Sequence, residues 1–386
     1  MDTMRALTFD RSRESWETSR GMVLEHVPRP ALRGVRDRSK VVIRVRYAGF
    51  CGTDRGIWAR KSMTEMVLGS LERTTTDKRI FGHELLGEIV EVGDKVSAKY
   101  GYRVGDVVST ESHIVCGACI QCRLGQHHVC ANEQIIGVSV DGCFADYVKL
   151  PAKAIWPTDI ERIRPEVAAV QEPFGNAVHA CQITDLRGQS VAIMGTGTIG
   201  LFAVLVAKGM GARRVIGVDP DPSRRAMATQ LGADHVLAPA APDPEAPHRA
   251  DRALAATIQD LTDGSGADVV LEMAGVPSSV NNAIRSVRRG GDVVLFGLRN
   301  GDLMVEDYHR IIMNGVQLHG VVGRRIFQTW EITKSLLEQT DNGIQQAIWD
   351  VILARGEGSI VDIDAFEPNS FEAVMGRFPK PLLRFA

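Results

Sequence analysis

The sequence carries almost no net charge, −2 over 386 residues, and so offers no excess of either sign for nucleic acid or an anionic membrane. It also lacks an uninterrupted apolar run long enough to span a bilayer. Residues 1–20 alternate charged and polar side chains and contain no apolar signal-peptide core, so we expect a cytoplasmic protein. The composition, 44% hydrophobic and 24% charged, is typical of globular proteins, and the length predicts two domains.

Cysteine is scarce, with seven in the chain, yet four of them fall in one short run, C-G-A-C-I-Q-C-R-L-G-Q-H-H-V-C. Their spacing allows four thiolates to reach the corners of a tetrahedron, which is the geometry of a structural zinc site. These four are Cys116, Cys119, Cys122 and Cys130. The alternative is a pair of disulfides, which is disfavoured in a long chain without a secretory signal. Cys143 and Cys181 lack ligand spacing, and we expect both to pack as small apolar side chains.

Two different patterns divide the chain. The first part contains short strand-like runs between glycine turns, for example residues 41–47 and 88–92, which predicts a compact antiparallel barrel-like domain. From about residue 190, apolar strand-like runs alternate with helix-length segments, which predicts an α/β domain with a doubly wound parallel sheet. Those runs are residues 191–194, 215–218, 269–273 and 293–296. The Ala- and Pro-rich residues 239–247 predict a surface loop, and residues 326–337 predict a helix.

A glycine-rich turn marks a nucleotide site in the second part. The run G-T-G-T-I-G follows a strand-like segment and opens a helical one, so its backbone can approach a pyrophosphate at a helix N-terminus. Asp219 ends the next strand, where a carboxylate can accept both ribose hydroxyls and repel a ribose phosphate, which favours NAD over NADP. Arg224 and Arg225 lie close by and leave NADP open. The candidate cofactor residues are Gly195, Gly197, Thr198, Ile199, Gly200 and Asp219.

A second set of metal-type ligands is scattered along the first part. Cys51, His83 and Glu172 offer one thiolate, one imidazole and one carboxylate, a set that can hold zinc and leave one position open. Glu84 adjoins His83, and Thr53 could hydrogen-bond an alcohol and carry its proton outward. The alternatives are ordinary core packing of the cysteine, a solvated carboxylate and a histidine in a turn. Sequence separation alone cannot show that these residues meet.

The motifs together resemble the zinc-dependent medium-chain alcohol dehydrogenases, and within them the L-threonine 3-dehydrogenase subgroup. The likeness covers about residues 41–337 and lies in C-G-T-D at 51, G-H-E at 82, the run 111–122, G-C-F-A-D-Y at 142, E-P-F-G-N-A-V-H at 172 and G-V-V-G-R-R-I-F-Q-T-W at 320. It implies a GroES-like catalytic domain over residues 1–175, a Rossmann domain over residues 176–318 and a return to the catalytic domain over residues 319–386.

The resemblance also implies roles for particular residues. It implies a catalytic zinc on Cys51, His83 and Glu172, with Glu84 entering or leaving its coordination, and a structural zinc on the four clustered cysteines. Asp219 and Arg224 match residues that hold the adenosine ribose, and Arg324 matches an arginine near the cofactor, the alternative being a solvated surface charge. Family members of this type are usually tetramers, so we expect a homo-oligomer, either a tetramer or a dimer.

One departure concerns the substrate side of the site. Relatives carry a histidine five residues after the zinc-ligand cysteine as the outer station of a proton relay, and this chain has Gly56 there. Residues 59–79 also differ from the family pattern in length and sequence. His113 and His179 are alternative relay candidates, although each is more often a structural histidine.

We therefore expect an NAD-dependent, zinc-containing enzyme that oxidises a secondary alcohol on a small polar substrate. Threonine is the best single substrate, and a polyol, sugar or cyclitol is the alternative because C-G-T-D-R also resembles sugar dehydrogenases. A non-catalytic nucleotide-binding protein is a further alternative, supported by Gly56 and opposed by the retained zinc-type ligands.

Overall fold

The structure is a computed structural model that describes residues 2–299 and 301–385. The chain forms two compact units, one made of Met1–Pro173 with Leu353–Ala386 and the other of Phe174–Ile352. The expected return to the first unit at residue 319 is wrong, because the return occurs at Leu353. Residues 319–352 stay with the second unit since β16 (Gln317–Gly320) extends its sheet and the π-helical turn Ile348–Ile352 packs on α7 (Thr198–Gly209).

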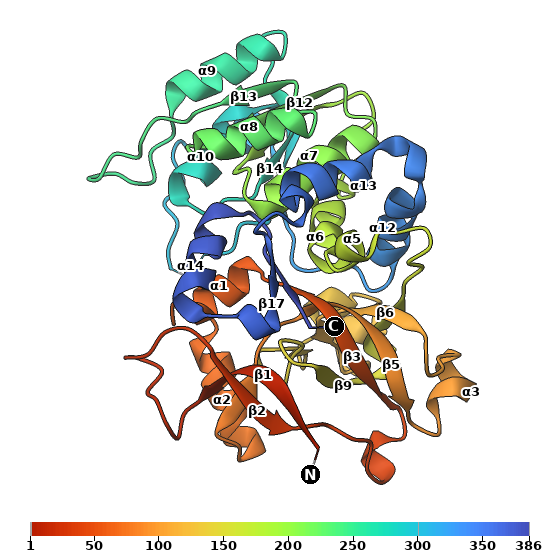
Figure 1. Cartoon of the computed structure of the whole chain (residues 1–386). Coiled ribbons are helices and arrows are strands. Elements are labelled where there is room, and N and C mark those ends of the chain that lie inside the picture. Colours follow the sequence, from red (N-terminus) through yellow and green to blue (C-terminus); the bar gives the residue numbers. More distant parts are fainter. Residues whose placement is uncertain (1, 300, 386) are drawn as a thin grey trace. The chain divides into compact units, whose positions relative to one another are not determined.

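The first unit is mostly antiparallel β structure, as the glycine-punctuated pattern predicts (Figure 1). Its largest sheet has the strand order β10-β6-β5-β3-β18-β17, and β9 pairs with the first half of β3. The strands are β3 (Lys40–Gly49), β5 (Glu84–Val92), β6 (Val107–Thr110), β9 (Tyr147–Pro151), β10 (Ile155–Pro157), β17 (Ile360–Asp362) and β18 (Leu382–Arg384). Two smaller sheets are β2-β1-β4 and β7-β8, formed by β1 (Thr3–Asp10), β2 (Val23–Pro28), β4 (Lys78–Ile80), β7 (His113–Ile114) and β8 (Gln134–Ile135).

Short helices connect and flank these strands. They are α1 (Gly52–Trp58), α2 (Thr64–Thr74), α3 (Val96–Tyr100), α4 (Ile120–Arg123), α5 (Pro165–Ala168) and α14 (Pro368–Arg377). An aromatic core lies beneath α1: the rings of Phe50 and Phe144 stack with centroids 5.4 Å apart, and Phe371 meets Phe50 edge-on at 5.0 Å. Cys143 is buried in the same core, which confirms its expected packing role. Because Phe50 directly precedes Cys51, this core fixes the start of the candidate site.

The second unit is built around a parallel sheet with the strand order β13-β12-β11-β14-β15-β16. This order runs outward in both directions from the first strand, which is the doubly wound Rossmann arrangement the sequence predicts. Its strands are β11 (Ser190–Met194), β12 (Arg214–Val218), β13 (His235–Leu237), β14 (Ala267–Glu272), β15 (Val287–Leu295) and β16. Its helices are α6 (Gln171–Cys181), which begins in the first unit, α7, α8 (Pro222–Gln230), α9 (Arg252–Leu261), α10 (Pro277–Ser286), α11 (His309–Met313), α12 (Gln328–Glu338) and α13 (Ile344–Ala347).

The local predictions for this unit are largely confirmed. All four apolar runs are strands of the sheet, residues 239–247 contain neither helix nor strand, and α12 covers the expected helix within two residues. The central strands β11 and β14 are almost entirely buried because helices flank the sheet, which explains their nearly continuous apolar composition, whereas the edge strand β16 is largely exposed. Cys181 is buried in α6, again as expected.

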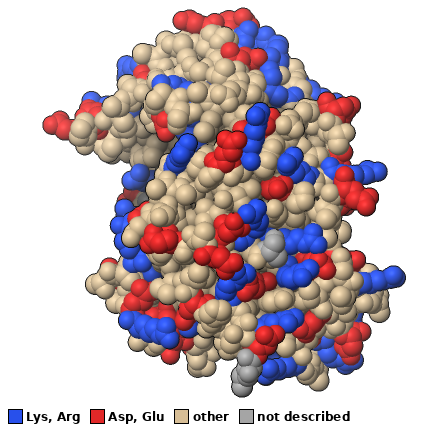
Figure 2. All heavy atoms as spheres, in the orientation of Figure 1, with Lys and Arg blue, Asp and Glu red and all other residues tan. Residues whose placement is uncertain are grey.

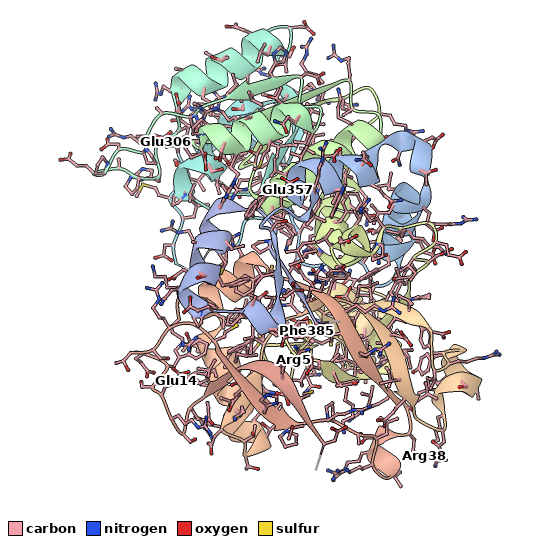
Figure 3. All side chains as sticks on the ribbon, in the orientation of Figure 1. Arg5, Glu14, Arg38, Glu306, Glu357 and Phe385 are labelled. Atoms are coloured by element: carbon pink, nitrogen blue, oxygen red, sulfur yellow. The ribbon has the colours of Figure 1, made fainter. Side chains whose placement is uncertain are left out.

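Charged side chains of both signs are interspersed on the face of the molecule that Figure 2 shows. Figure 2 shows Lys and Arg mixed with Asp and Glu over the visible face, in agreement with the small net charge. One charged side chain links the N-terminal and C-terminal segments of the first unit: the Arg5 guanidinium donates a hydrogen bond to the carbonyl of Phe385 at 3.0 Å (Figure 3). Among the described residues, no helix combines the length and apolar character that a membrane span requires.

Candidate active site and cofactor loop

Two strands distant in sequence bring the catalytic candidates together. β3 pairs with β5 so that Gly49, at the end of one, lies opposite Glu84, at the start of the other. Cys51 follows Gly49 by two residues, and His83 directly precedes Glu84. One ligand atom from each of Cys51, His83 and Glu84 lies within 4.8 Å of the other two. A thiolate, an imidazole and a carboxylate at this separation fit a zinc ion with one position left for substrate.

Two glycines provide the space for this convergence. A Cβ on Gly49 would lie 2.0 Å from Oε2 of Glu84, so only glycine fits opposite that carboxylate. Gly82 has φ +90°, and a Cβ there would lie 2.3 Å from the Phe144 ring. A side chain at either position would therefore displace Glu84 or the turn that carries His83.

Lys380, which belongs to no motif recognised in the sequence, neutralises Glu84. Its Nζ lies 2.8 Å from both oxygens of the Glu84 carboxylate and 3.3 Å from the Phe50 carbonyl. The two side chains are 1% and 0% exposed, so the pair is fully shielded from water. Arg55 of α1 donates to the carbonyl of Phe378 and thereby ties the segment that carries Lys380 to the helix after Cys51.

Asp54 is a second buried group that supports the ligands. Its Oδ2 accepts a hydrogen bond from the Cys51 backbone N–H at 2.9 Å, and its Oδ1 lies 3.6 Å from Nδ1 of His83. Burial opposes the charged imidazole, but Asp54 and the Cys51 thiol outweigh it and raise the pKa of His83 well above its usual value. A carboxylate beside a ligand histidine fixes the ring orientation and strengthens its basicity, so Asp54 is suited to orient His83 toward a metal.

Glu172 does not join the three-residue group. It lies at the start of α6, 3% exposed, and its Oε1 accepts a hydrogen bond from Ser112 Oγ at 2.6 Å. Its charge nevertheless raises the pKa values of His83 and Glu84, although burial is the largest influence on each, so it lies in the same electrostatic environment. The structure thus brings Glu84, rather than the expected Glu172, together with Cys51 and His83.

The helix after Cys51 explains the departure at Gly56. Thr53 is half-buried in the first turn of α1. One turn later, a Cβ on Gly56 would lie 2.1 Å from Oγ of Ser62, because the unusual segment 59–79 folds back against α1 before forming α2. A histidine at position 56 would collide with this segment, so the glycine is required by the way the altered segment packs on α1.

The two alternative relay histidines have partners elsewhere. His113 Nδ1 lies 2.7 Å from Oε2 of Glu133, within the lobe that contains β7 and β8. His179 is 1% exposed, and its Nδ1 lies 2.8 Å from the Gly323 carbonyl. These contacts are those of structural histidines.

The four clustered cysteines converge as a second group. Their Sγ atoms all lie within 4.8 Å of one another, and all seven cysteines are free thiols. Backbone N–H groups of Ala118 and Cys119 each donate to Cys116 Sγ at 3.3 Å and lower the pKa of Cys116 to about 6. Burial raises the pKa of Cys122 to about 12. Donors aimed at sulfur favour thiolates, so this lobe fits a closed tetrahedral zinc site.

The glycine-rich turn lies between β11 and α7, as predicted. Gly195 has φ +92°, and a Cβ on Gly200 would lie 1.9 Å from the Gly195 carbonyl oxygen, so the helix packs directly on the turn. Asp219 follows β12, and its Oδ2 accepts a hydrogen bond from the Thr196 N–H at 2.8 Å. The N-terminal turn of α7, with Thr198 and Ile199, provides the kind of helix N-terminus that binds the anionic phosphates of a dinucleotide.

Three arginines near the expected cofactor site differ in their surroundings. The Arg225 guanidinium donates to the backbone carbonyls of Asp219 and Pro220, both at 2.7 Å. Arg224 is half-buried, with its Nη1 3.9 Å from Met227 Sδ. Arg324 is 1% exposed and donates to Asn176 Oδ1 at 2.8 Å, so it is not the solvated surface charge that the sequence left open.

A GroES-like β unit with two groups of metal ligands, together with a Rossmann unit, defines a class of enzyme. The chain belongs to the zinc-dependent medium-chain alcohol dehydrogenases. Residues 37–160 match the alcohol dehydrogenase GroES-like domain, and residues 198–339 match the zinc-binding dehydrogenase domain. It is accordingly a zinc- and NAD(P)-dependent enzyme that oxidises a secondary alcohol.

Individual relatives indicate which members of this family the chain is similar to in sequence and in fold. The chain is 40% identical over 335 residues to the L-threonine 3-dehydrogenase of Symbiobacterium thermophilum, which covers 87% of each chain. It is 38% identical over 299 residues to the L-threonine 3-dehydrogenase of Pyrococcus horikoshii, which covers 78% of this chain and 80% of that one. The alcohol dehydrogenase TADH from Thermus sp. ATN1 shares the fold with a TM-score of 0.79 at 22% identity over 99% of both chains.

The buried pair of Glu84 and Lys380 yields a prediction about stability. Lys380→Met should lower the free energy of unfolding by about 3 to 5 kcal/mol, because it leaves a buried carboxylate without its countercharge. Denaturant unfolding monitored by fluorescence measures this loss. Adding Glu84→Gln to Lys380→Met should restore most of the stability, since no unpaired charge remains.

The matched control is Lys61→Met, which removes an exposed lysine from the same unit and should leave stability within about 0.5 kcal/mol of the parent. Equal losses in Lys380→Met and Lys61→Met would show that the buried pair contributes nothing.

Proposed function

We propose that this enzyme oxidises the β-hydroxyl of L-threonine to a ketone, giving 2-amino-3-oxobutanoate, with NAD as the hydride acceptor. The observation that carries the proposal is the similarity to L-threonine 3-dehydrogenases over 78–87% of the chain, combined with the convergence of Cys51, His83 and Glu84. Threonine fits the reaction class because its hydroxyl is a secondary alcohol on a small polar molecule.

The chain's own residues divide the work of the reaction. Cys51 and His83 would hold the catalytic zinc, with Glu84 and Glu172 as alternative carboxylate ligands. Bound zinc supplies a Lewis acid that lowers the pKa of an alcohol, and the dinucleotide supplies the hydride acceptor. Thr53, in the first turn of α1, would accept the proton of the substrate hydroxyl. Asp54 orients His83, and Lys380 neutralises the charge of Glu84 while that carboxylate is not bound to zinc.

A polyol, sugar or cyclitol is the second candidate substrate. It is favoured by one feature, the contact of Gly56 with Ser62, which accompanies a segment 59–79 unlike that of threonine dehydrogenases. The family resemblance implies that this segment borders the substrate pocket. A changed segment there would alter which polar groups face the substrate while the metal ligands stay the same.

A kinetic screen with purified enzyme and NAD decides between these substrates. We expect NADH production from L-threonine with a kcat/KM at least about tenfold above that of sorbitol or myo-inositol, because a site built for an ammonium and carboxylate loses those contacts with a neutral polyol. Cys51→Ser should abolish turnover of whichever substrate is used. Rapid turnover of a polyol without measurable activity on threonine would replace the first candidate with the second.

Zinc content separates an enzyme from a non-catalytic nucleotide-binding protein. We propose two zinc ions per chain, one on the four clustered cysteines and one on the Cys51 group, and the free thiols fit a reducing cytoplasm. Elemental analysis giving one zinc per chain, lost when Cys119 is replaced by Ser, would favour the binding protein.

The preference for NAD over NADP is assigned to Asp219. Asp219→Ala should weaken NAD binding by about tenfold or more and leave NADP binding less affected, because the carboxylate both accepts ribose hydroxyls and repels a 2′-phosphate. Titration calorimetry with each dinucleotide measures the two affinities. The matched control is Asp221→Ala, which removes the carboxylate that caps α8 two residues later and should leave NAD affinity unchanged. An unchanged NAD affinity in Asp219→Ala would contradict the assignment.

We also propose a homo-oligomer, in which a second copy covers an apolar stretch of the second unit. Between residues 298 and 322 large apolar side chains are exposed beside the edge strand β16, including Leu298, Met304, Tyr308, Ile312, Met313 and Leu318. Light scattering should give a mass that is two or four times 42.1 kDa. Met313→Glu should lower this mass, whereas Val35→Glu, at an 80% exposed position of the first unit, should not.

A further inference from the structure

A buried carboxylate with no assigned role lies at the carboxyl edge of the parallel sheet. Glu272 is the last residue of β14, beside β11, and is 0% exposed. Its Oε1 accepts three hydrogen bonds: from the Ala274 N–H at 3.0 Å, the Gly275 N–H at 2.9 Å and the Ser279 hydroxyl at 2.7 Å. The carboxylate therefore fixes both the turn after β14 and the start of α10.

The turn that Glu272 fixes packs against the glycine-rich cofactor loop. A Cβ on Gly195 would lie 2.9 Å from the Ala274 Cβ and 3.0 Å from its backbone nitrogen. Gly195 thus approaches residue 274 as closely as its lack of a side chain allows. Because Ala274 is exposed while Gly275 is buried, this turn forms part of the surface beside the loop.

The same carboxylate also contacts the loop after β15. A Cβ on Gly297 would lie 2.1 Å from the Gly275 nitrogen and 2.7 Å from Oε2 of Glu272. The Gly297 N–H donates to the Glu272 backbone carbonyl at 3.0 Å. Three loops that follow adjacent strands, at residues 195, 274–275 and 297, therefore pack together at the turn that Glu272 holds.

We infer that Glu272 is a positioning residue for the dinucleotide. By holding residues 274–275 in place, it keeps the glycine-rich loop and the loop at Gly297 in the positions that bind the cofactor. The inference rests on the binding of NAD(P) at the carboxyl edge of this sheet, where ligands of doubly wound folds bind. Without the Oε1 acceptor, the N–H groups of Ala274 and Gly275 and the Ser279 hydroxyl lose a shared partner. The turn could then relax only by moving toward Gly195 or Gly297, which are already in close contact with it.

The test measures NADH binding by fluorescence in the absence of any alcohol substrate, on full-length protein. Glu272→Leu keeps the approximate volume but removes the acceptor, and its NADH affinity should fall about tenfold or more. Glu272→Gln retains an oxygen acceptor at Oε1 and should bind NADH within about threefold of the parent. In steady-state assays of Glu272→Leu, KM for NAD should rise more than kcat falls.

Asp268 provides a matched control on the same strand. Its carboxylate also holds the backbone of β11, because Oδ2 accepts a part-buried hydrogen bond from the Ser190 N–H at 2.8 Å, but at the opposite end of β14. Asp268→Leu should reduce stability and leave NADH affinity unchanged. Equal weakening of NADH binding in Asp268→Leu and Glu272→Leu would assign Glu272 a structural role only and overturn the inference.

Two further results keep the inference separate from the proposed function. If Glu272→Leu does not fold, Glu272→Asp decides, because its shorter side chain withdraws the acceptor from the turn, and parental NADH affinity in that variant would overturn the inference. Failure of the parent protein to bind NADH would instead remove NAD from the proposed function. A threonine-negative, polyol-positive enzyme would leave the role of Glu272 intact.

Discussion

Gly49 lies opposite Glu84 in the pairing of β3 with β5, and this register sets the geometry of the candidate catalytic centre. It places Cys51, two residues beyond the end of one strand, next to His83 and Glu84 at the start of the other. A slip of one residue would turn every side chain of β5 to the opposite face of the sheet. The absence of a Cβ at position 49 leaves room for the Glu84 carboxylate next to Cys51 and His83. The pairing of the two strands therefore also sets the geometry of the metal ligands.

Assembling this centre buries several charged side chains, which is unfavourable unless each has a partner. The surrounding residues provide such partners. Glu84 is neutralised by Lys380, which arrives from the C-terminal segment, while Asp54 faces His83 from the first turn of α1. Each partner lies within hydrogen-bonding or ion-pairing distance because an isolated charge in this core would be too unfavourable to persist. In the second unit the buried Glu272 is stabilised differently, because its Oε1 accepts hydrogen bonds from the backbone of the turn that it organises.

Local patterns predicted more than distant ones. The four cysteines, the glycine-rich turn and the apolar strands of the parallel sheet could be recognised because each signal lies within a short stretch of chain. Asp54, Lys380 and Glu272 gave no comparable signal, since a single carboxylate or ammonium looks the same in sequence whether it is solvated or buried. The carboxylate beside Cys51 and His83 is Glu84 rather than Glu172, a choice that depends on the pairing of β3 with β5 and on the hydrogen bond from Ser112 to Glu172. The second unit extends to Ile352 because packing on α7, rather than any local pattern, holds residues 319–352 there.

The sequence by itself determined the class of each element: a cysteine lobe with zinc spacing, a β unit rich in glycine turns, and an alternating unit with a phosphate loop. Those properties follow from residue type and spacing over a few positions, where the covalent chain already fixes distance. Only the tertiary structure decided which residues share a site, namely Cys51 with His83 and Glu84, Glu84 with Lys380, Gly56 with Ser62, and Glu272 with the loops at Gly195 and Gly297. The physical reason is that strand register and core packing set these distances between residues up to 296 positions apart, as for Glu84 and Lys380.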